Sequence, residues 1–297
     1  LGQVLWKVMI LHNFVCNQLI TSNKKEKNKI EKIEDCQMKQ NKMHNKPETK
    51  IAKNEDNTLR FLSLLKKLVD FTGMFTGTDM LSRFNTIHCV NLAQGLKEPV
   101  IYYQQSHDRR HVDAVKKGLR DIATYNGQPQ GMYGGDEGLH GNVPTQGSEL
   151  CSAVELMYSL EKMTEITGDI DFVDHLERIA FNALPAQVTD DFMNKQYFQQ
   201  ANQVSATRDP HNFYEDHNHG HTDIVFGSRT GYPCCFSNMH QGWPKFTQNL
   251  WYATHDGGLA AMVYSPCNVT AEVAGGVRVT IAERTQYPFD EQIRFEI

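Results

Sequence analysis

The apolar residues of this chain repeat with two different periods, and the period changes near Trp251. Upstream of that residue they recur every three or four positions, which is the spacing of an amphipathic helix. Gly and Pro commonly terminate helices, so the pattern predicts helices joined by short turns. The apolar stripes begin at Leu59, Val90, Val112, Leu150 and Phe172, and they end at or next to Gly73, Pro99, Gly127, Gly168 and Pro185.

Downstream of Trp251 apolar residues alternate with polar ones, as in a strand with one buried face. Helical hairpins followed by strands predict a mainly α chain, with a partial α/α toroid and then the start of a β-sandwich. So few antiparallel strands leave an unpaired edge, so we expect further strands or a partner to complete the β part. The alternating runs are Val277, Val279 and Ile281, then Ile293, Phe295 and Ile297, with Gly-Gly turns at 257 and 275.

Residues 22–57 are dominated by Lys, Asn and Glu, with few apolar residues and no aromatic one. Such a composition buries too little apolar surface to offset chain entropy, so we expect a disordered or loosely helical linker. A basic targeting patch is the alternative, but acidic residues interrupt the lysines. The predicted division is 1–57 for an N-terminal segment with this linker, 58–250 for the helical domain and 251–297 for the β domain.

The charge balance narrows the choice of partners. Thirty Lys and Arg residues against 35 Asp and Glu give a formal charge of -5 and a pI near 6.2. This argues against a nucleic acid or an anionic membrane and fits a neutral substrate. Polar residues break the apolar stretch 1–20, so we predict no membrane span, and the stretch lacks the features of a signal peptide. A cytoplasmic location is therefore favoured, and a homo-oligomer remains open.

Cysteines provide the most unusual local features. Their number, seven, is odd and they form no evenly spaced framework, which favours reduced thiols or metal ligands over disulfides. Cys234 and Cys235 are adjacent, and together with Glu149 and Cys151 they could hold a four-coordinate zinc ion. Residues two apart in a helix point about 200° apart, so Glu149 and Cys151 could share a metal only at an extended or distorted helix start. Buried core thiols are the alternative.

Two further motifs carry candidate functional groups. Glu137 lies in a glycine-rich loop, where a carboxylate can face a cavity and act as general acid and base. A solvated loop acid is the alternative. His217, His219 and His221 alternate, so on a strand they would share one face as a metal-binding set, although the surrounding polar residues favour a loop.

Three motifs in order resemble glycoside hydrolase family 127 and its relatives, the β-L-arabinofuranosidases. They are TIHCVNLAQG at 86–95, GMYGGDEGLHGNVPTQGSELC at 131–151 and YPCCFSNMHQGWPK at 232–245. The resemblance covers the chain from about Thr72 to Ile297. It implies an (α/α)6 toroid, here partial because residues 1–57 show no matching motif, followed by a β-sandwich.

The resemblance also implies a site and a chemistry. One glutamate and three cysteines would hold zinc, and these positions fall on Glu149, Cys151, Cys234 and Cys235. Cys234 would be the nucleophile of a retaining double displacement on a furanoside glycan, in place of the usual carboxylate. Glu137 would be the acid/base, with Asp136 as the fallback, and His88 resembles a sugar-contacting histidine.

Two other hypotheses compete with this enzyme. One is a catalytically inactive, zinc-stabilised carbohydrate-binding or structural module, motivated by the part of the barrel that has no matching motif. The other is a fragment that does not fold alone.

Overall fold

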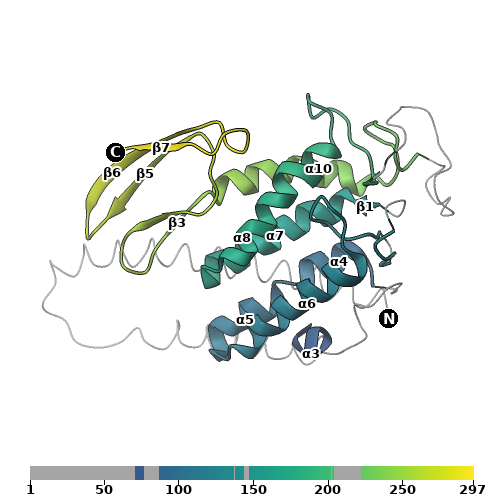
Figure 1. Cartoon of the computed structure of the whole chain (residues 1–297), viewed down its shortest axis with the longest axis horizontal. Coiled ribbons are helices and arrows are strands. Elements are labelled where there is room, and N and C mark those ends of the chain that lie inside the picture. The colour runs from purple at the N-terminus through teal and green to yellow at the C-terminus, as the bar shows by residue number, and fades with distance from the viewer. Residues whose placement is uncertain (1–70, 77–86, 137, 144–146, 202, 204–221) are drawn as a thin grey trace, which may run out of the picture. The chain divides into compact units, whose positions relative to one another are not determined.

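The structure is a computed structural model that describes residues 71–76, 87–136, 138–143, 147–201, 203 and 222–297 (Figure 1). The helices are α3 (Phe71–Thr76), α4 (Cys89–Gly95), α5 (Glu98–Ser106), α6 (Arg110–Asn126), α7 (Leu150–Thr167), α8 (Ile170–Arg178), the π-turn η1 (Ile179–Ala183), α9 (Leu184–Ala186) and α10 (Cys234–Gln248). The strands are β1 (Ser148–Glu149), β2 (Phe198–Gln199), β3 (Trp251–Ala253), β4 (Leu259–Ala261), β5 (Cys267–Val273), β6 (Val277–Thr285) and β7 (Ile293–Glu296).

Helices α4, α6, α7 and α8 begin close to the positions that the apolar stripes predict, whereas no stripe predicts α5. Helix α4 stops before Pro99, which lies in the first turn of α5, where a missing N–H costs no hydrogen bond. Helix α7 ends at Gly168, whose φ of 65° is the left-handed conformation that glycine adopts readily. Asp169 then caps α8 by accepting a hydrogen bond from the N–H of Asp171. The predicted hairpin α7/α8 is therefore confirmed, and α5 packs against α6 in a second hairpin that the apolar stripes did not predict.

Helix α7 is the centre of the helical part (Figure 1). It contacts α4, α5, α8 and α10, and most of its residues are buried on all sides. Because neighbours cover its whole circumference, polar residues such as Ser159 and Glu161 are buried with the apolar ones. A helix buried in this way holds its first turn in a fixed position.

The helix predicted from the stripe at Phe172 differs from the structure near its C-terminal end. The sequence predicts a helix that stops at Pro185, whereas the chain continues through the π-turn η1 and then α9 as far as Ala186. In the π-turn the N–H of Leu184 bonds to the carbonyl of Ile179, five residues back. Pro185 is then in the first turn of α9, where it does not break the helix.

The strands after Trp251 form two small antiparallel sheets, as the alternation predicts. One is the hairpin β3–β4, closed by Gly257 and Gly258, and the other has the order β5–β6–β7. Glu283 on β6 is fully buried and ties them together. Its carboxylate accepts hydrogen bonds from Trp251 Nε1 at 3.1 Å and from the N–H of Ser265 at 3.1 Å.

The last strand departs from the expected half-buried pattern. Phe295 is 43% exposed and Ile297 is 89% exposed, although both lie on the predicted apolar face. The ring of Phe295 is only partly covered, by an edge contact with the Trp251 ring at a centroid distance of 5.7 Å and by the Tyr264 ring. In the same described part of the chain, no helix is long and apolar enough to cross a membrane.

Several predictions concern residues outside the described ranges. These are the N-terminal segment 1–57, the helix predicted from Leu59, and the candidate metal set His217, His219 and His221. The short helix α3 is described, and it passes Gly73 and ends at Thr76.

Candidate metal centre and active site

Glu149 and Cys151 lie where strand β1 ends and helix α7 begins. Glu149 belongs to β1, which pairs with β2, and its φ of -73° and ψ of 138° are those of extended backbone. Cys151 is in the first turn of α7. This break in the backbone removes the roughly 200° separation that an ideal helix would impose on residues two apart. Both side chains are buried.

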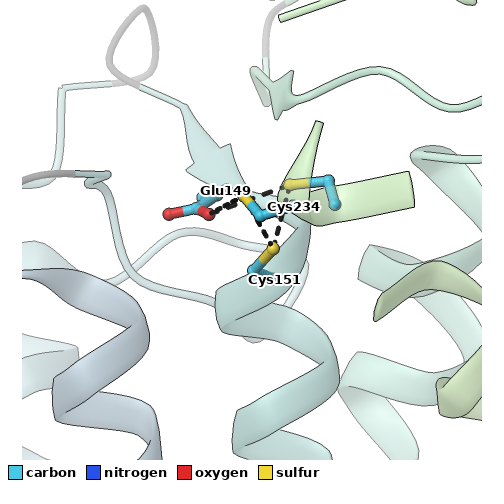
Figure 2. Close-up of side chains that lie close together, drawn as sticks. Glu149, Cys151 and Cys234 are labelled. Carbon is cyan, nitrogen blue, oxygen red and sulfur yellow. Dashed lines mark hydrogen bonds between the residues drawn. The ribbon is translucent and has the colours of Figure 1, made fainter. Parts of the chain in front are cut away.

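Cys234 and Cys235 open helix α10, which packs along α7. The first turns of the two helices therefore meet, although their residues are more than eighty positions apart in sequence. Figure 2 shows Glu149, Cys151 and Cys234 pointing toward one another at this junction. Cys235 is buried, whereas Cys234 is exposed. Of the three thiols, Cys234 is thus the one that an incoming molecule can reach.

The four side chains form a compact group whose ligand atoms all lie within 4.8 Å of one another. Cys151 Sγ is 3.5 Å from Cys234 Sγ and 3.1 Å from Cys235 Sγ. Glu149 Oε1 is 3.8 Å from Cys234 Sγ and 3.7 Å from Cys235 Sγ. A tetrahedral zinc ion with Zn–S bonds of about 2.3 Å places its sulfur ligands about 3.8 Å apart. Small side-chain shifts would satisfy that geometry, so this group could hold a metal ion.

The three thiols differ in pKa, which is lowered for Cys234 and raised for Cys151 and Cys235. The pKa of Cys234 falls to about 3, because Cys151 and Cys235 hydrogen-bond to its thiolate and the Lys195 ammonium lies nearby. Hydrogen bonds to Cys234 and Cys235, together with burial, raise the pKa of Cys151. Burial is the main cause that raises the pKa of Cys235. Negative charge therefore concentrates on the exposed sulfur, and the N-terminus of α10 favours it there.

The loop that contains position 137 is anchored on both sides of that position. Glu137 itself lies outside the described residues, but its neighbours are tied to Cys89 of α4. The Cys89 N–H donates to the Asp136 carbonyl at 2.8 Å, and its thiol donates to the Gly138 carbonyl at 3.2 Å. The same loop reaches β1, because the N–H of Glu149 donates to the Gly135 carbonyl at 3.2 Å. The loop therefore borders the Glu149 end of the thiol group.

Asp136 and His88 have clear structural positions. Asp136 is 1% exposed, and its Oδ1 lies 3.0 Å from His140 Nε2. His88 directly precedes α4, which begins one residue before the predicted Val90, and its Nδ1 accepts a hydrogen bond from the Asn91 N–H at 3.4 Å. The structure thus gives His88 a capping role in addition to any contact with a ligand.

Two residues near the site were not identified from the sequence. Cys89 stands inside the 86–95 motif, but only its contacts with the 135–138 loop single it out. Lys195 is fully buried, and its Nζ donates to the carbonyls of Thr230 and Tyr232, just before Cys234. No spacing or motif marks Lys195 in the sequence.

Comparison with known proteins identifies the family. The sequence model of the beta-L-arabinofuranosidase GH127 catalytic domain matches residues 23–248. The chain therefore belongs to this family. The match begins at residue 23, so it includes most of the segment 1–57 in which the sequence analysis found no matching motif, and it stops before β3. No curated protein gives a significant match.

Solved structures share the fold. A GH127 beta-L-arabinofuranosidase from Geobacillus stearothermophilus matches 72% of this chain at 18% identity, with a TM-score of 0.60. Another GH127 beta-arabinofuranosidase matches 80% at 18% identity, with a TM-score of 0.61, and a glycoside hydrolase matches 80% at 17%, with 0.56. The chain spans 33%, 37% and 42% of their respective lengths. These matches confirm the predicted fold class, a partial (α/α)6 toroid followed by strands.

Proposed function

We propose that this chain carries the catalytic centre of a retaining glycoside hydrolase acting on β-L-arabinofuranosides. The observation that supports it most directly is the group of Glu149, Cys151, Cys234 and Cys235, in which only Cys234 is exposed. The substrate class follows from the family to which the chain belongs. A carbohydrate is also consistent with the absence of a basic excess in the sequence.

The residue set fits a zinc ion. Glu149, Cys151, Cys234 and Cys235 would hold it, since three thiolates and one carboxylate are ligands that zinc accepts in a tetrahedral site. When bound, zinc would keep all three cysteines deprotonated at neutral pH. The buried ligands Glu149, Cys151 and Cys235 would fix the position of Cys234.

In the first step, Cys234 Sγ attacks the anomeric carbon of the sugar. A C–S bond forms while the bond to the leaving oxygen breaks, and the carboxylic acid of Glu137 gives its proton to that oxygen. In the second step the Glu137 carboxylate takes a proton from water, whose oxygen attacks the same carbon and breaks the C–S bond. Two inversions restore the configuration, and Cys234 returns to the thiolate.

Glu137 suits the acid/base role better than Asp136. An acid/base must reach the leaving oxygen, whereas Asp136 is buried and engaged with His140. His88 would contact the sugar from the start of α4, close to the same loop.

The test compares Cys234→Ser with Cys267→Ser, a matched change on β5 in the β region. We expect Cys234→Ser to lower kcat on a nitrophenyl β-L-arabinofuranoside by at least about a thousandfold, with Cys267→Ser close to wild type. Turnover by Cys234→Ser near the wild-type rate would refute the nucleophile assignment. Mass spectrometry of the trapped glycosyl-enzyme should place the sugar on Cys234.

The acid/base is tested separately with Glu137→Gln. A nitrophenolate leaving group needs little protonation, so this variant should form the glycosyl-enzyme but hydrolyse it slowly. Added azide should restore turnover and give a glycosyl azide of retained configuration, because azide needs no general base. Bound zinc without any turnover by the wild-type chain would instead favour the inactive, zinc-stabilised module.

A further inference from the structure

Lys195 is a buried cation whose position is set by its own backbone. The residue follows α9 and lies just before β2, and its side chain is 0% exposed. Its carbonyl accepts a hydrogen bond from the Gly227 N–H at 3.0 Å, so the two segments are held together there. Burying an ammonium group is costly unless hydrogen bonds and opposite charge compensate it.

The hydrogen bonds of this ammonium go to the turn in front of the cysteine pair. Lys195 Nζ donates to the Tyr232 carbonyl at 3.0 Å and also to the Thr230 carbonyl. Between these residues, Gly231 has a φ of 58° and packs so closely that an added Cβ would lie 2.3 Å from Tyr197 Cβ. Cys234 begins α10 two residues after Tyr232. Lys195 therefore braces the backbone from which Cys234 projects.

Among the described residues, the thiol group provides the main negative charge near this ammonium. In the described part of the chain, no carboxylate lies within ion-pair distance of Lys195 Nζ. Burial lowers the pKa of Lys195, and the charges of Cys235, Cys234 and Cys151 act against that shift, with a smaller effect from Asp223. Three thiolates and one carboxylate carry four negative charges, and the two positive charges of zinc would compensate only two of them. A buried cation beside such a centre stabilises its charge.

We propose that Lys195 is a positioning residue that braces the turn 230–232 and serves as the counter-charge of the Glu149, Cys151, Cys234 and Cys235 site. This inference rests on the proposed zinc site. It predicts that Lys195 controls how strongly the site holds its metal, through charge as well as through shape.

The test measures Zn²⁺ affinity of the full chain by competition with a chromogenic chelator. Lys195→Met keeps the length of the side chain but removes the charge and both hydrogen bonds. The matched control is Lys97→Met, because Lys97 is 2% exposed and its Nζ bonds to the Gln94 carbonyl and Ser159 Oγ. We expect Lys195→Met to weaken zinc binding about 10- to 100-fold, with Lys97→Met within about threefold of wild type.

A spectroscopic readout separates charge from general damage. With Co²⁺ in place of zinc, the thiolate-to-cobalt absorption should move to longer wavelength in Lys195→Met, because the sulfurs lose a stabilising positive charge. Lys97→Met should leave that band unchanged. If Lys195→Met does not fold, Lys195→Gln and Lys195→Arg replace it, since both keep a donor and only arginine keeps the charge. Zinc binding weakened in the glutamine variant alone supports the proposal.

The outcomes that overturn the inference are distinct from those that overturn the function. A wild-type chain that binds zinc while the neutral Lys195 variants bind it equally well refutes the role of Lys195 and leaves the enzyme proposal intact. A wild-type chain that binds no zinc refutes both. Equal losses in Lys195→Met and Lys97→Met would show only the cost of a buried lysine and would also refute the proposal.

Discussion

Replacing Gly135 by alanine tests whether the loop 135–138 must keep its place between α4 and β1. An added Cβ would lie 2.3 Å from Cys89 Sγ and 2.4 Å from the Gly138 carbonyl oxygen. Non-bonded contacts to carbon are favourable at about 3.5 to 4.0 Å, so the loop would have to move by roughly 1 Å. The Cys89–Gly138 hydrogen bond would open as it moved.

The magnitude of the effect follows from that displacement. Overpacking of this kind costs about 1–3 kcal/mol of stability. A misplacement of about 1 Å at a catalytic group can lower a rate about a hundredfold. Because Gly135 lies two residues before Glu137, we expect Gly135→Ala to lower kcat about a hundredfold while zinc content stays close to wild type.

Gly168→Ala is the matched control. Gly168 also has a positive φ, 65°, but an added Cβ there meets nothing within 4 Å. It should lose about 1–2 kcal/mol from the left-handed backbone alone and keep the wild-type kcat. Urea unfolding, hydrolysis of the nitrophenyl substrate and metal analysis on both variants make the comparison. If Gly135→Ala had the wild-type kcat, loop placement would not limit catalysis and the reasoning would be refuted.

Two further predictions concern stability. Where the zinc concentration exceeds the Kd a thousandfold, removing zinc with a chelator should lower the free energy of unfolding by about 4 kcal/mol. If the chelator left the melting temperature of a zinc-loaded sample unchanged, a structural metal would be contradicted. Burial raises the pKa of Glu161 from 4.5 to about 8, so the folded chain binds a proton that the unfolded chain releases in this range. Stability should therefore fall as pH rises from about 4.5 to 8, by up to about 1.4 kcal/mol per unit. Glu161→Gln should flatten this dependence in urea unfolding series; an unaltered slope would argue against Glu161 as its source.

Most helices and turns could be predicted from the sequence because local features specify them. The apolar stripe from Leu150 and the stop at Gly168 depend on residues close together in the chain, and helix α7 follows them. The helical segment from Ile170 ends at Ala186, one residue past the predicted end at Pro185, but the π-turn inside it was not predicted. Apolar spacing alone does not reveal a change from α to π hydrogen bonding.

The sequence likewise identifies the residues of the candidate site but not the contacts that bring them together. The motif residues Glu149, Cys151, Cys234 and Cys235 could be chosen from the sequence by their chemistry and by resemblance. Only the packing of α10 on α7 brings the two motifs within reach of each other. The extended backbone at Glu149 comes from the pairing of β1 with β2, a contact between segments about fifty residues apart.

The sequence by itself did not predict α5, α10 or the pair β1–β2. It did determine most of the other helices, the strands after Trp251 and the candidate metal ligands, because these depend on local periodicity and on residue chemistry. The tertiary structure decided which thiol is exposed, how the 135–138 loop is tied to Cys89, and that the Lys195 ammonium supports the turn before Cys234. Burial and charge compensation are properties of groups distant in sequence, so they exist only once the helices have packed.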